Sequence, residues 1–335
     1  MPTIAIDVMS GDRGPHERIA GTLQVLRERP ELNVLLVGRP EAVAPELEQL
    51  PAALKGRLAI ESAQHVIAMD EAPRAAVRRG RESSMRIAVN LVKDGRAAAC
   101  VSAGNTGALT AISHFVLKTV ANVERAAIMS AIPSSKGHTH MLDLGANTRA
   151  TALQLLQFAR MGSIVVRDLY GISAPRVGLL NIGEEDTKGH EVVQAAHALL
   201  GASDIRYVGF VEGDAIFGGE VDVVVTDGFT GNVALKTMEG LARLIAARTR
   251  QELRGSWRGV IGARIAQPAL KRLADSLDPR RYNGACMVGL RGIVVKSHGS
   301  ADATAFGRAI ELAAQAAAGE LTARIAQAFV PTEGA

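Results

Sequence analysis

The chain is poor in cysteine and aromatic residues and has no long apolar run, and each shortage excludes a class of protein. Only two cysteines, Cys100 and Cys286, occur among 335 residues, which excludes a disulfide framework and indicates a reducing compartment. Aromatic residues make up 3% of the chain, so a core of alanine, valine, leucine and isoleucine is expected. No run of about 18 apolar residues occurs, so we expect no transmembrane helix.

Charge and composition narrow the class further. A net charge of +4 is too small to indicate a nucleic-acid partner, so any functional charge must be local. The apolar run before Asp7 is short, and an acidic residue follows it directly, which is unlike a secretory signal. We therefore expect a cytoplasmic protein. An apolar fraction of 47% and a charged fraction of 21% are typical of globular proteins. A chain of 335 residues can form one large domain or two closely packed lobes.

Short β-branched runs alternate with helical stretches along the whole chain. The runs predict buried parallel strands at 3–8, 34–37, 98–102, 128–132, 177–181, 221–226 and 292–296. The stretches between them predict helices at 17–29, 84–93, 107–118, 150–161, 189–200, 233–253 and 303–329. This alternation predicts an α/β fold: a doubly wound, mostly parallel sheet with helices on both faces. Ligands of such sheets bind beyond the carboxyl ends of the strands.

Five of the predicted strands run into loops rich in Gly, Asn and Asp, at 7–12, 102–107, 143–147, 181–189 and 227–232. Glycine lets the backbone approach a ligand closely, and a following helix offers free N–H groups to an anion. Any single loop could equally be a tight turn, in which the same residues are expected. Five such loops in one chain, each after a strand, favour a site for a phosphate-type anion.

Familiar catalytic signatures are missing. No G-x-G-x-x-G follows the first strand and no G-x-x-x-x-G-K-[ST] occurs, which disfavours a dinucleotide dehydrogenase or a P-loop kinase. His138 and His140 are typical of a solvated loop rather than of metal ligands. Cys100 lies in an apolar run, and Cys286 has no acidic or histidine neighbour that would activate it. We therefore predict no metal, no cofactor and no covalent nucleophile, and chemistry that depends on positioning and electrostatics.

The loops, in this order and at these spacings, resemble the bacterial phosphate acyltransferases of the PlsX type. The segments that carry the resemblance lie at 6–12, 102–108, 178–185, 225–236 and 296–299, and Asp-Gly-Phe-Thr-Gly-Asn at 227–232 is highly specific. The likeness extends from Ile4 to about Phe329. It implies a single acyltransferase domain over 1–335. One departure is Ser10, where the family usually has glycine; a backbone that needed positive φ there would be strained.

The resemblance implies that inorganic phosphate attacks the thioester of a long-chain acyl carrier protein, giving acyl phosphate for phospholipid synthesis. The implied catalytic pair is Lys188, which offers positive charge, and Asn232, which offers an amide donor. The alternative is a solvated lysine at a helix start, with Glu184, Glu185 and Asp186 holding Lys188 in place. The residues predicted to bind phosphate or the rest of the substrate are Asp7, Ser10, Gly11, Asp12, Ser102, Gly104, Asn105, Thr106, Asn181, Asp227 and Gly231.

A basic segment at 243–277 predicts a further surface. Between Arg243 and Arg272 basic residues outnumber a lone Glu252, and apolar residues recur at helical spacing. Pro268 predicts a hairpin of two helices rather than one long helix. Such a segment can lie on an anionic membrane, dock the acidic carrier or form a homodimer interface, and the resemblance implies peripheral association with the inner face of the membrane. The contact residues are predicted to be Trp257, Ile261, Arg264, Ile265, Leu270, Lys271 and Arg272.

Two other kinds of function stay open. One is a coenzyme A-dependent phosphate acetyltransferase, or a relative of the decarboxylating dehydrogenases on a similar scaffold. The other is a non-catalytic module that binds acyl carrier protein and the membrane. The intact set of polar loops favours catalysis over a scaffold. The basic segment and the apolar composition favour a carrier-borne long chain over acetyl-coenzyme A.

Overall fold

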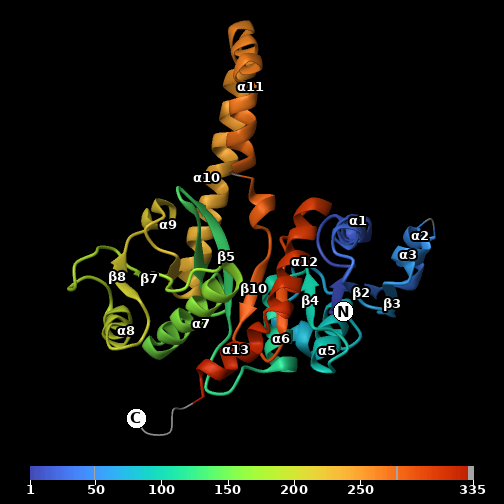
Figure 1. Ribbon diagram of the computed structural model, residues 1–335, viewed down its shortest axis with the longest axis horizontal. Helices are drawn as coiled ribbons and strands as arrows, with labels where there is room; N and C mark the ends of the chain where they lie inside the picture. The colour runs from blue at the N-terminus through green and yellow to red at the C-terminus, as the bar shows by residue number, and fades with distance from the viewer. Residues whose placement is uncertain (49, 277, 331–335) are drawn as a thin grey trace.

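The computed structural model describes residues 1–48, 50–276 and 278–330 (Figure 1). Within these residues eleven strands form one sheet, and helices pack on both of its faces. The predicted α/β class is therefore confirmed. In sheet order the strands are β3 (Leu58–Ser62), β2 (Asn33–Gly38), β1 (Thr3–Asp7), β4 (Ala99–Ser102), β11 (Ile293–Lys296), β10 (Ala285–Val288), β5 (Ala127–Ser134), β6 (Gly137–Leu142), β9 (Val223–Val225), β7 (Val177–Leu180) and β8 (Tyr207–Val211).

The sheet is mostly parallel, as predicted, but its two parallel halves run in opposite directions. Strands β3, β2, β1, β4 and β11 pair in parallel on one side. Strands β6, β9, β7 and β8 pair in parallel on the other. Three antiparallel pairings, β11 with β10, β10 with β5 and β5 with β6, separate the halves. Because this number of reversals is odd, the strands of the two halves run in opposite directions. The carboxyl ends of one half therefore lie at the edge of the sheet where the other half has its amino ends.

Residues of each strand alternate between two apolar layers. Ile4 and Ile6 of β1 belong to one buried cluster, and Ala5 between them belongs to the other. The first layer includes residues of α1 (Gly14–Glu28), α2 (Pro40–Leu47), α3 (Ala52–Lys55), α7 (Ala152–Tyr170), α8 (Glu191–Gly201), α12 (Ala303–Ala318) and α13 (Leu321–Ala328). The second includes residues of α4 (Pro73–Arg79), α5 (Ser84–Lys93), α6 (Thr106–Leu117), α9 (Ala215–Gly218) and the beginning of α10 (Gly228–Arg254).

Two of the helix predictions are corrected by the structure. The predicted helix at 303–329 is divided into α12 and α13, because the chain leaves helical geometry at Glu320, whose φ is +51°. The helix predicted at 233–253 begins earlier, at Gly228, where Asp227 caps its first turn. All seven predicted strands overlap observed ones, whereas β3, β6, β8 and β10 were missed.

Helices α10 and α11 (Trp257–Ser276) lie side by side and form an arm that extends from the sheet (Figure 1). The prediction that Pro268 separates them is wrong: Pro268 lies inside α11, and the chain turns after Arg254. No residue of α11 is buried, so water can satisfy the carbonyl group that the proline leaves without a partner. The short helix η1 (Pro279–Tyr282) leads back to the sheet. Leu277, the last residue of the predicted segment, lies outside the described residues.

Candidate active site

The first group of loops follows β1, β4 and β11, which are parallel neighbours. The Ser102 hydroxyl donates to the Asp7 carboxylate at 2.6 Å. The Ser10 hydroxyl donates to the Asp7 carbonyl at 2.7 Å and accepts from the Ala103 N–H at 2.8 Å. Burial raises the pKa of Asp7, although hydrogen bonds from Ser102 and other serines oppose this effect. These three predicted site residues are brought together, and their side chains fasten the loop after β1 to the loop after β4.

Gly11 occupies a position that only glycine fits. Its φ is +86°, and a Cβ there would stand 2.5 Å from Arg18 Nη2 and 2.8 Å from the Gly299 carbonyl oxygen. Ser10 is not among the described non-glycine residues with positive φ, so the departure from the family pattern causes no backbone strain. The buried Arg18 guanidinium donates to the carbonyls of Ser10 at 3.1 Å and Gly299 at 2.8 Å. It thereby holds the loops after β1 and β11 together. Gly104, in the loop after β4, is also buried.

Asn105 begins α6 and ties it to a neighbouring segment. Its Oδ1 accepts from the Ala108 N–H at 2.9 Å, and its Nδ2 donates to the carbonyls of Met69 at 2.7 Å and Glu71 at 3.1 Å. The Asn105 amide is thus used within the protein. Thr106 is exposed at the first position of α6, where backbone N–H groups have no partner inside the helix. This helix end can therefore offer N–H groups to an anion.

Lys296 at the end of β11 is a candidate that the sequence analysis missed. Its side chain is 9% exposed, and Nζ donates to the Ala103 carbonyl at 3.3 Å and to the Ser297 carbonyl. Burial lowers the pKa of Lys296 to about 8, and the positive charges of Arg18 and Lys236 act in the same direction. A lysine that ends a buried strand, inside the segment 296–299, was the signal available in the sequence.

The second group of loops follows β6, β9 and β7, which are also parallel neighbours. The buried Asp143 carboxylate accepts backbone N–H bonds from Gly145 at 3.2 Å and from further residues of its loop. The first turn of α10 rests on this loop, since a Cβ at Gly231 would collide with the Asp143 carbonyl. Asp227 caps the same turn. Asn232 is exposed and lies beside Gly145, where an added Cβ would stand 3.5 Å from Asn232 Cβ.

Asn181 braces the loop that follows β7. Its Nδ2 donates to the Gly183 carbonyl at 3.0 Å. Gly189 closes the loop with a φ of +92°, and a Cβ there would stand 2.6 Å from Asn181 Oδ1. The side chain of Asn181 therefore sets the shape of the loop that carries Lys188.

Lys188 is exposed in this loop. In the described part of the chain, no ion pair joins its ammonium group to Glu184, Glu185 or Asp186, and Asp186 instead lies 3.8 Å from His197 Nε2. The alternative in which its acidic neighbours hold Lys188 through ion pairs therefore has no support here. Its ammonium group faces solvent and can meet an incoming anion.

The two groups of loops open at opposite edges of the sheet, and α10 runs between them. Asn232 in the first turn of α10 adjoins the second group. Further along the helix, the charges of Lys236 and Glu239 act on His298, which follows β11 in the first group, and they oppose one another. Burial is the main reason that the pKa of His298 is lowered, and the exposed Asp12 raises it slightly. We take both groups and the beginning of α10 as the candidate active site.

A groove of about 640 Å³ lies between α6 and the loop after β6. It runs beside α4 and α6 and reaches the loop after β6. Its floor comes from the beginning of β5 and the end of β10. The lining residues are Pro73, Arg74, Val77, Arg78, Gly107, Thr110, Ala111, His114, Phe115, Arg125, Ala126, Ala127, Gly145, Ala146, Asn147, Met287 and Leu290.

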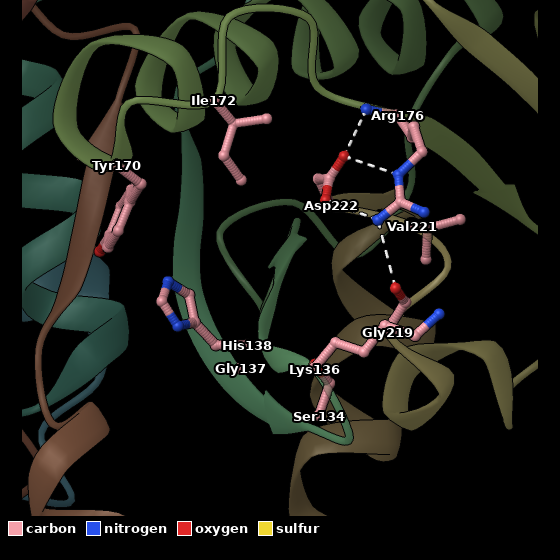
Figure 2. A pocket seen from close by; sticks show the side chains of 10 residues that line it. All are labelled: Ser134, Lys136, Gly137, His138, Tyr170, Ile172, Arg176, Gly219, Val221 and Asp222. Atoms are coloured by element: carbon pink, nitrogen blue, oxygen red, sulfur yellow. Dashed lines mark hydrogen bonds and ion pairs between the residues drawn. The ribbon is translucent and has the colours of Figure 1, made fainter.

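A smaller cavity of about 240 Å³ lies at the turn between β5 and β6 (Figure 2). Arg176 pairs with Asp222 on one side, and the rings of His138 and Tyr170 lie 5.1 Å apart on the other. No predicted site residue lines it. His140, predicted to lie in a solvated loop, is instead buried in β6, where its ring packs 4.2 Å from that of Tyr170.

The residues predicted for membrane or carrier contact all lie on α11, and none of them is buried. Trp257 is 70% exposed and Ile265 is 78% exposed. No helix of the described residues is long and apolar enough to cross a membrane. Among those residues no three His, Cys, Asp or Glu side chains are grouped so that they could hold a metal ion.

Known proteins resemble the chain over nearly its whole length. The model of the family described as "Fatty acid synthesis protein" matches residues 2–324. The phosphate acyltransferase of Alkalilimnicola ehrlichii is 51% identical over 311 residues, covering 93% of this chain and 91% of the relative. That of Halorhodospira halophila is 49% identical over 316 residues, covering 94% and 92%.

Solved structures share the fold. A phosphotransacetylase from Streptococcus pyogenes superposes with a TM-score of 0.61 at 17% identity, covering 95% of this chain and 94% of the other. A branched-chain phosphotransacylase from Enterococcus faecalis gives a TM-score of 0.57 at 15% identity, covering 95% and 99%. Identities this low indicate a common fold and nothing more specific.

Proposed function

The chain belongs to the PlsX-type phosphate acyltransferase family, and from this premise we propose that it transfers a long-chain fatty acyl group from acyl carrier protein to inorganic phosphate. Membership makes it an acyltransferase that uses phosphate; the carrier and the chain length are the proposal. A phosphate oxygen attacks the thioester carbon and forms a C–O bond through a tetrahedral oxyanion. The C–S bond then breaks, acyl phosphate is released, and the carrier sulfur takes up a proton.

The observation that carries this proposal is the buried ammonium group of Lys296 among the loops after β1, β4 and β11. Phosphate is already a dianion near neutral pH, so the reaction requires an anion cradle rather than a strong general base. Lys296 supplies a positive charge, and the beginning of α6 at Thr106 supplies N–H groups and the positive end of a helix dipole. In a partly water-excluded site these groups attract phosphate strongly.

Asn232 and Lys188 are proposed to stabilise the developing oxyanion. They belong to the loops after β9 and β7, which are adjacent strands, so both loops lie at the same edge of the sheet. Both side chains are exposed, which leaves them accessible to a substrate. Donors held in place before the reaction stabilise charge that appears only in the transition state.

A direct assay tests the activity. Palmitoyl acyl carrier protein and inorganic phosphate are incubated with the protein, and acyl phosphate is trapped with hydroxylamine and measured. We expect phosphate-dependent formation of palmitoyl hydroxamate. If acetyl-coenzyme A is instead the faster acyl donor, the phosphate acetyltransferase alternative replaces this proposal.

Activity is expected to depend on the charge of Lys296. Its pKa of about 8 lies below the usual value, so the ammonium group is charged below pH 8 and neutral above it. We expect kcat/KM for phosphate to fall about ten-fold per pH unit above pH 8, since this ratio reports ionisation in the free enzyme. Lys296→Met should lower kcat/KM at pH 7 and abolish the fall of kcat/KM above pH 8. A profile that is flat to pH 9.5, or unchanged in Lys296→Met, contradicts the role of Lys296.

No acyl-enzyme is expected on the pathway. Cys100 and Cys286 are both buried, and burial raises the pKa of each thiol, to about 12 for Cys286. Neither is therefore a thiolate at neutral pH. The variant with both cysteines replaced by alanine should keep kcat within about three-fold, because it loses no group that acts on the substrate. Mass-spectrometric capture of an acylated cysteine during turnover would overturn this prediction.

The arm formed by α10 and α11 is proposed to bring the enzyme to an anionic membrane surface at the inner face of the membrane. Its exposed apolar residues, such as Ile261 and Ile265, alternate with arginines. A basic amphipathic helix can bury its apolar face at the boundary between headgroups and acyl chains. This location suits a product that is passed to a membrane enzyme. Carrier docking and a homodimer interface are the alternatives for the same surface.

A further inference from the structure

The groove of about 640 Å³ reaches both groups of loops in the candidate active site. Gly107, in the first turn of α6, lines it beside Thr106 of the anion cradle. Gly145, in the loop after β6, also lines it and lies next to Asn232, as described above. A molecule in this groove can therefore lie with one end beside Thr106 of the anion cradle.

One face of α6 forms a wall of the groove. Gly107, Ala111 and Phe115 follow one another at intervals of four residues, so they form a stripe on the helix. Gly107 and Phe115 are separated by about 12 Å along the axis of α6. Small residues at the first two positions leave the space open, and Phe115 lies at the far end, where the Arg86 guanidinium is 4.9 Å from the centre of its ring.

The groove is suited to a hydrocarbon. Its floor and opposite wall include Val77, Met287 and Leu290, and its volume lies within the range of about 300–1,000 Å³ typical of small-molecule sites. A pantetheine arm contains amides that require hydrogen-bond partners when buried, whereas a methylene chain requires none. Eleven of the seventeen described lining residues are glycine or carry an apolar side chain, which favours a methylene chain as the occupant.

The rim of the groove is basic. Arg74, Arg78 and Arg125 line it, and among its described lining residues none is acidic. Arginine can pack its methylene groups against an apolar wall while its guanidinium stays in water. Pro73, which precedes Arg74 in α4, adjoins Gly107: a Cβ at Gly107 would stand 2.9 Å from Pro73 Cγ. Positive charge thus lies near the reactive end, where it complements an acidic carrier.

We infer that this groove holds the fatty acyl chain of the thioester donor. The thioester lies beside Gly107, and the chain runs along α6 toward Phe115. This inference rests on the proposed acyl transfer to phosphate and adds the place of the acyl chain. It also makes the length of the groove the determinant of chain-length preference.

Ala111→Phe tests the inference, because a ring at the middle of the stripe blocks the groove. We expect kcat/KM for palmitoyl acyl carrier protein to fall by about 60-fold or more, since each buried methylene strengthens binding about four-fold and at least three are displaced. The value for butyryl acyl carrier protein should change less than about two-fold, because a short chain stays on the near side of residue 111. Ala198→Phe, an exposed position on α8 on the other face of the sheet, is the matched control and should leave both values unchanged.

The outcomes distinguish the proposed acyl transfer to phosphate from the proposed place of the acyl chain. If the unaltered enzyme forms no palmitoyl phosphate, the proposed function fails. If it forms palmitoyl phosphate but Ala111→Phe leaves the ratio of palmitoyl to butyryl activity unchanged, the groove does not hold the chain.

A second experiment uses the unaltered protein. Carrier protein that bears an acyl chain with a terminal diazirine is photolysed with the enzyme, and the labelled peptides are sequenced. Labels within 110–115 or 287–290 support the inference. Labels confined to α10 and α11 overturn it.

Discussion

Replacement of Asn232 or Lys188 by alanine is expected to lower kcat for acyl phosphate formation by a factor of about 10²–10³, because each removes one donor to the developing oxyanion. Asn232 is exposed in the first turn of α10, and Lys188 is exposed in the loop after β7. Neither substitution creates a cavity in the core, so the fold should be retained. Turnover of palmitoyl acyl carrier protein with phosphate measures the effect, and circular dichroism and the Tm verify the fold.

Matched controls separate catalysis from surface charge and helix stability. Thr237→Ala changes an exposed residue of α10, and Lys55→Ala removes an exposed ammonium group from α3, far along the sheet. Both should keep turnover close to that of the unaltered enzyme. Wild-type turnover in Asn232→Ala or Lys188→Ala would remove that residue from the mechanism. Equal losses in a control and its test variant would also contradict the assigned role.

Strands with buried, β-branched sequences could be predicted, and strands with other sequences could not. All four residues of β4 and of β11 are buried, and the sequence of each strand is apolar up to the polar residue that ends it. The missed strands β3 and β8 form the two edges of the sheet and are partly exposed. The missed strand β6 contains the polar residues Thr139 and His140, which are buried only through tertiary contacts.

The missed strands also explain what the sequence could not reveal about the site. Both β6 and β10 take part in the antiparallel pairings that reverse the second half of the sheet. Without β6 and β10, all loops that follow the predicted parallel strands would be expected at the same carboxyl end of the sheet. Local sequence identified the polar loops but not their division into two groups, because strand direction depends on pairings distant in sequence.

Residue types alone did not distinguish side chains that could bind the substrate from side chains that hold neighbouring backbone segments in place. Asn105 and Asn181 were predicted as substrate ligands, and in the structure their amides donate to backbone carbonyls of neighbouring segments. Their assignment to substrate stays a prediction. Lys296 was overlooked as a site residue because a lysine at a strand end is usually solvated, and only the fold buries it.

The last prediction concerns the arm formed by α10 and α11. Changing Ile261 and Leu270 to glutamate should release the protein from anionic vesicles, because the apolar face of α11 can then no longer enter the acyl boundary. The arginines of the arm add about 1 kcal/mol each near an anionic leaflet, so binding should also weaken steeply with added salt. Carrier docking would show the same dependence on salt, so the apolar face decides between the two. Co-sedimentation with vesicles that contain phosphatidylglycerol measures binding, and turnover of soluble acyl carrier protein is measured in parallel.

Gln267→Glu is the matched control, because it adds a negative charge to an exposed position of α11 without removing an apolar side chain. It should retain most vesicle binding if apolar insertion is required. The membrane role predicts that the variant with both Ile261→Glu and Leu270→Glu loses vesicle binding while its turnover stays nearly unchanged. Collapse of turnover with persistent vesicle binding would instead assign the arm to the carrier or to a second subunit. Dimer dissociation in that variant, measured by analytical ultracentrifugation, would then distinguish those two roles, because only a subunit interface requires α11 to be covered in the absence of carrier.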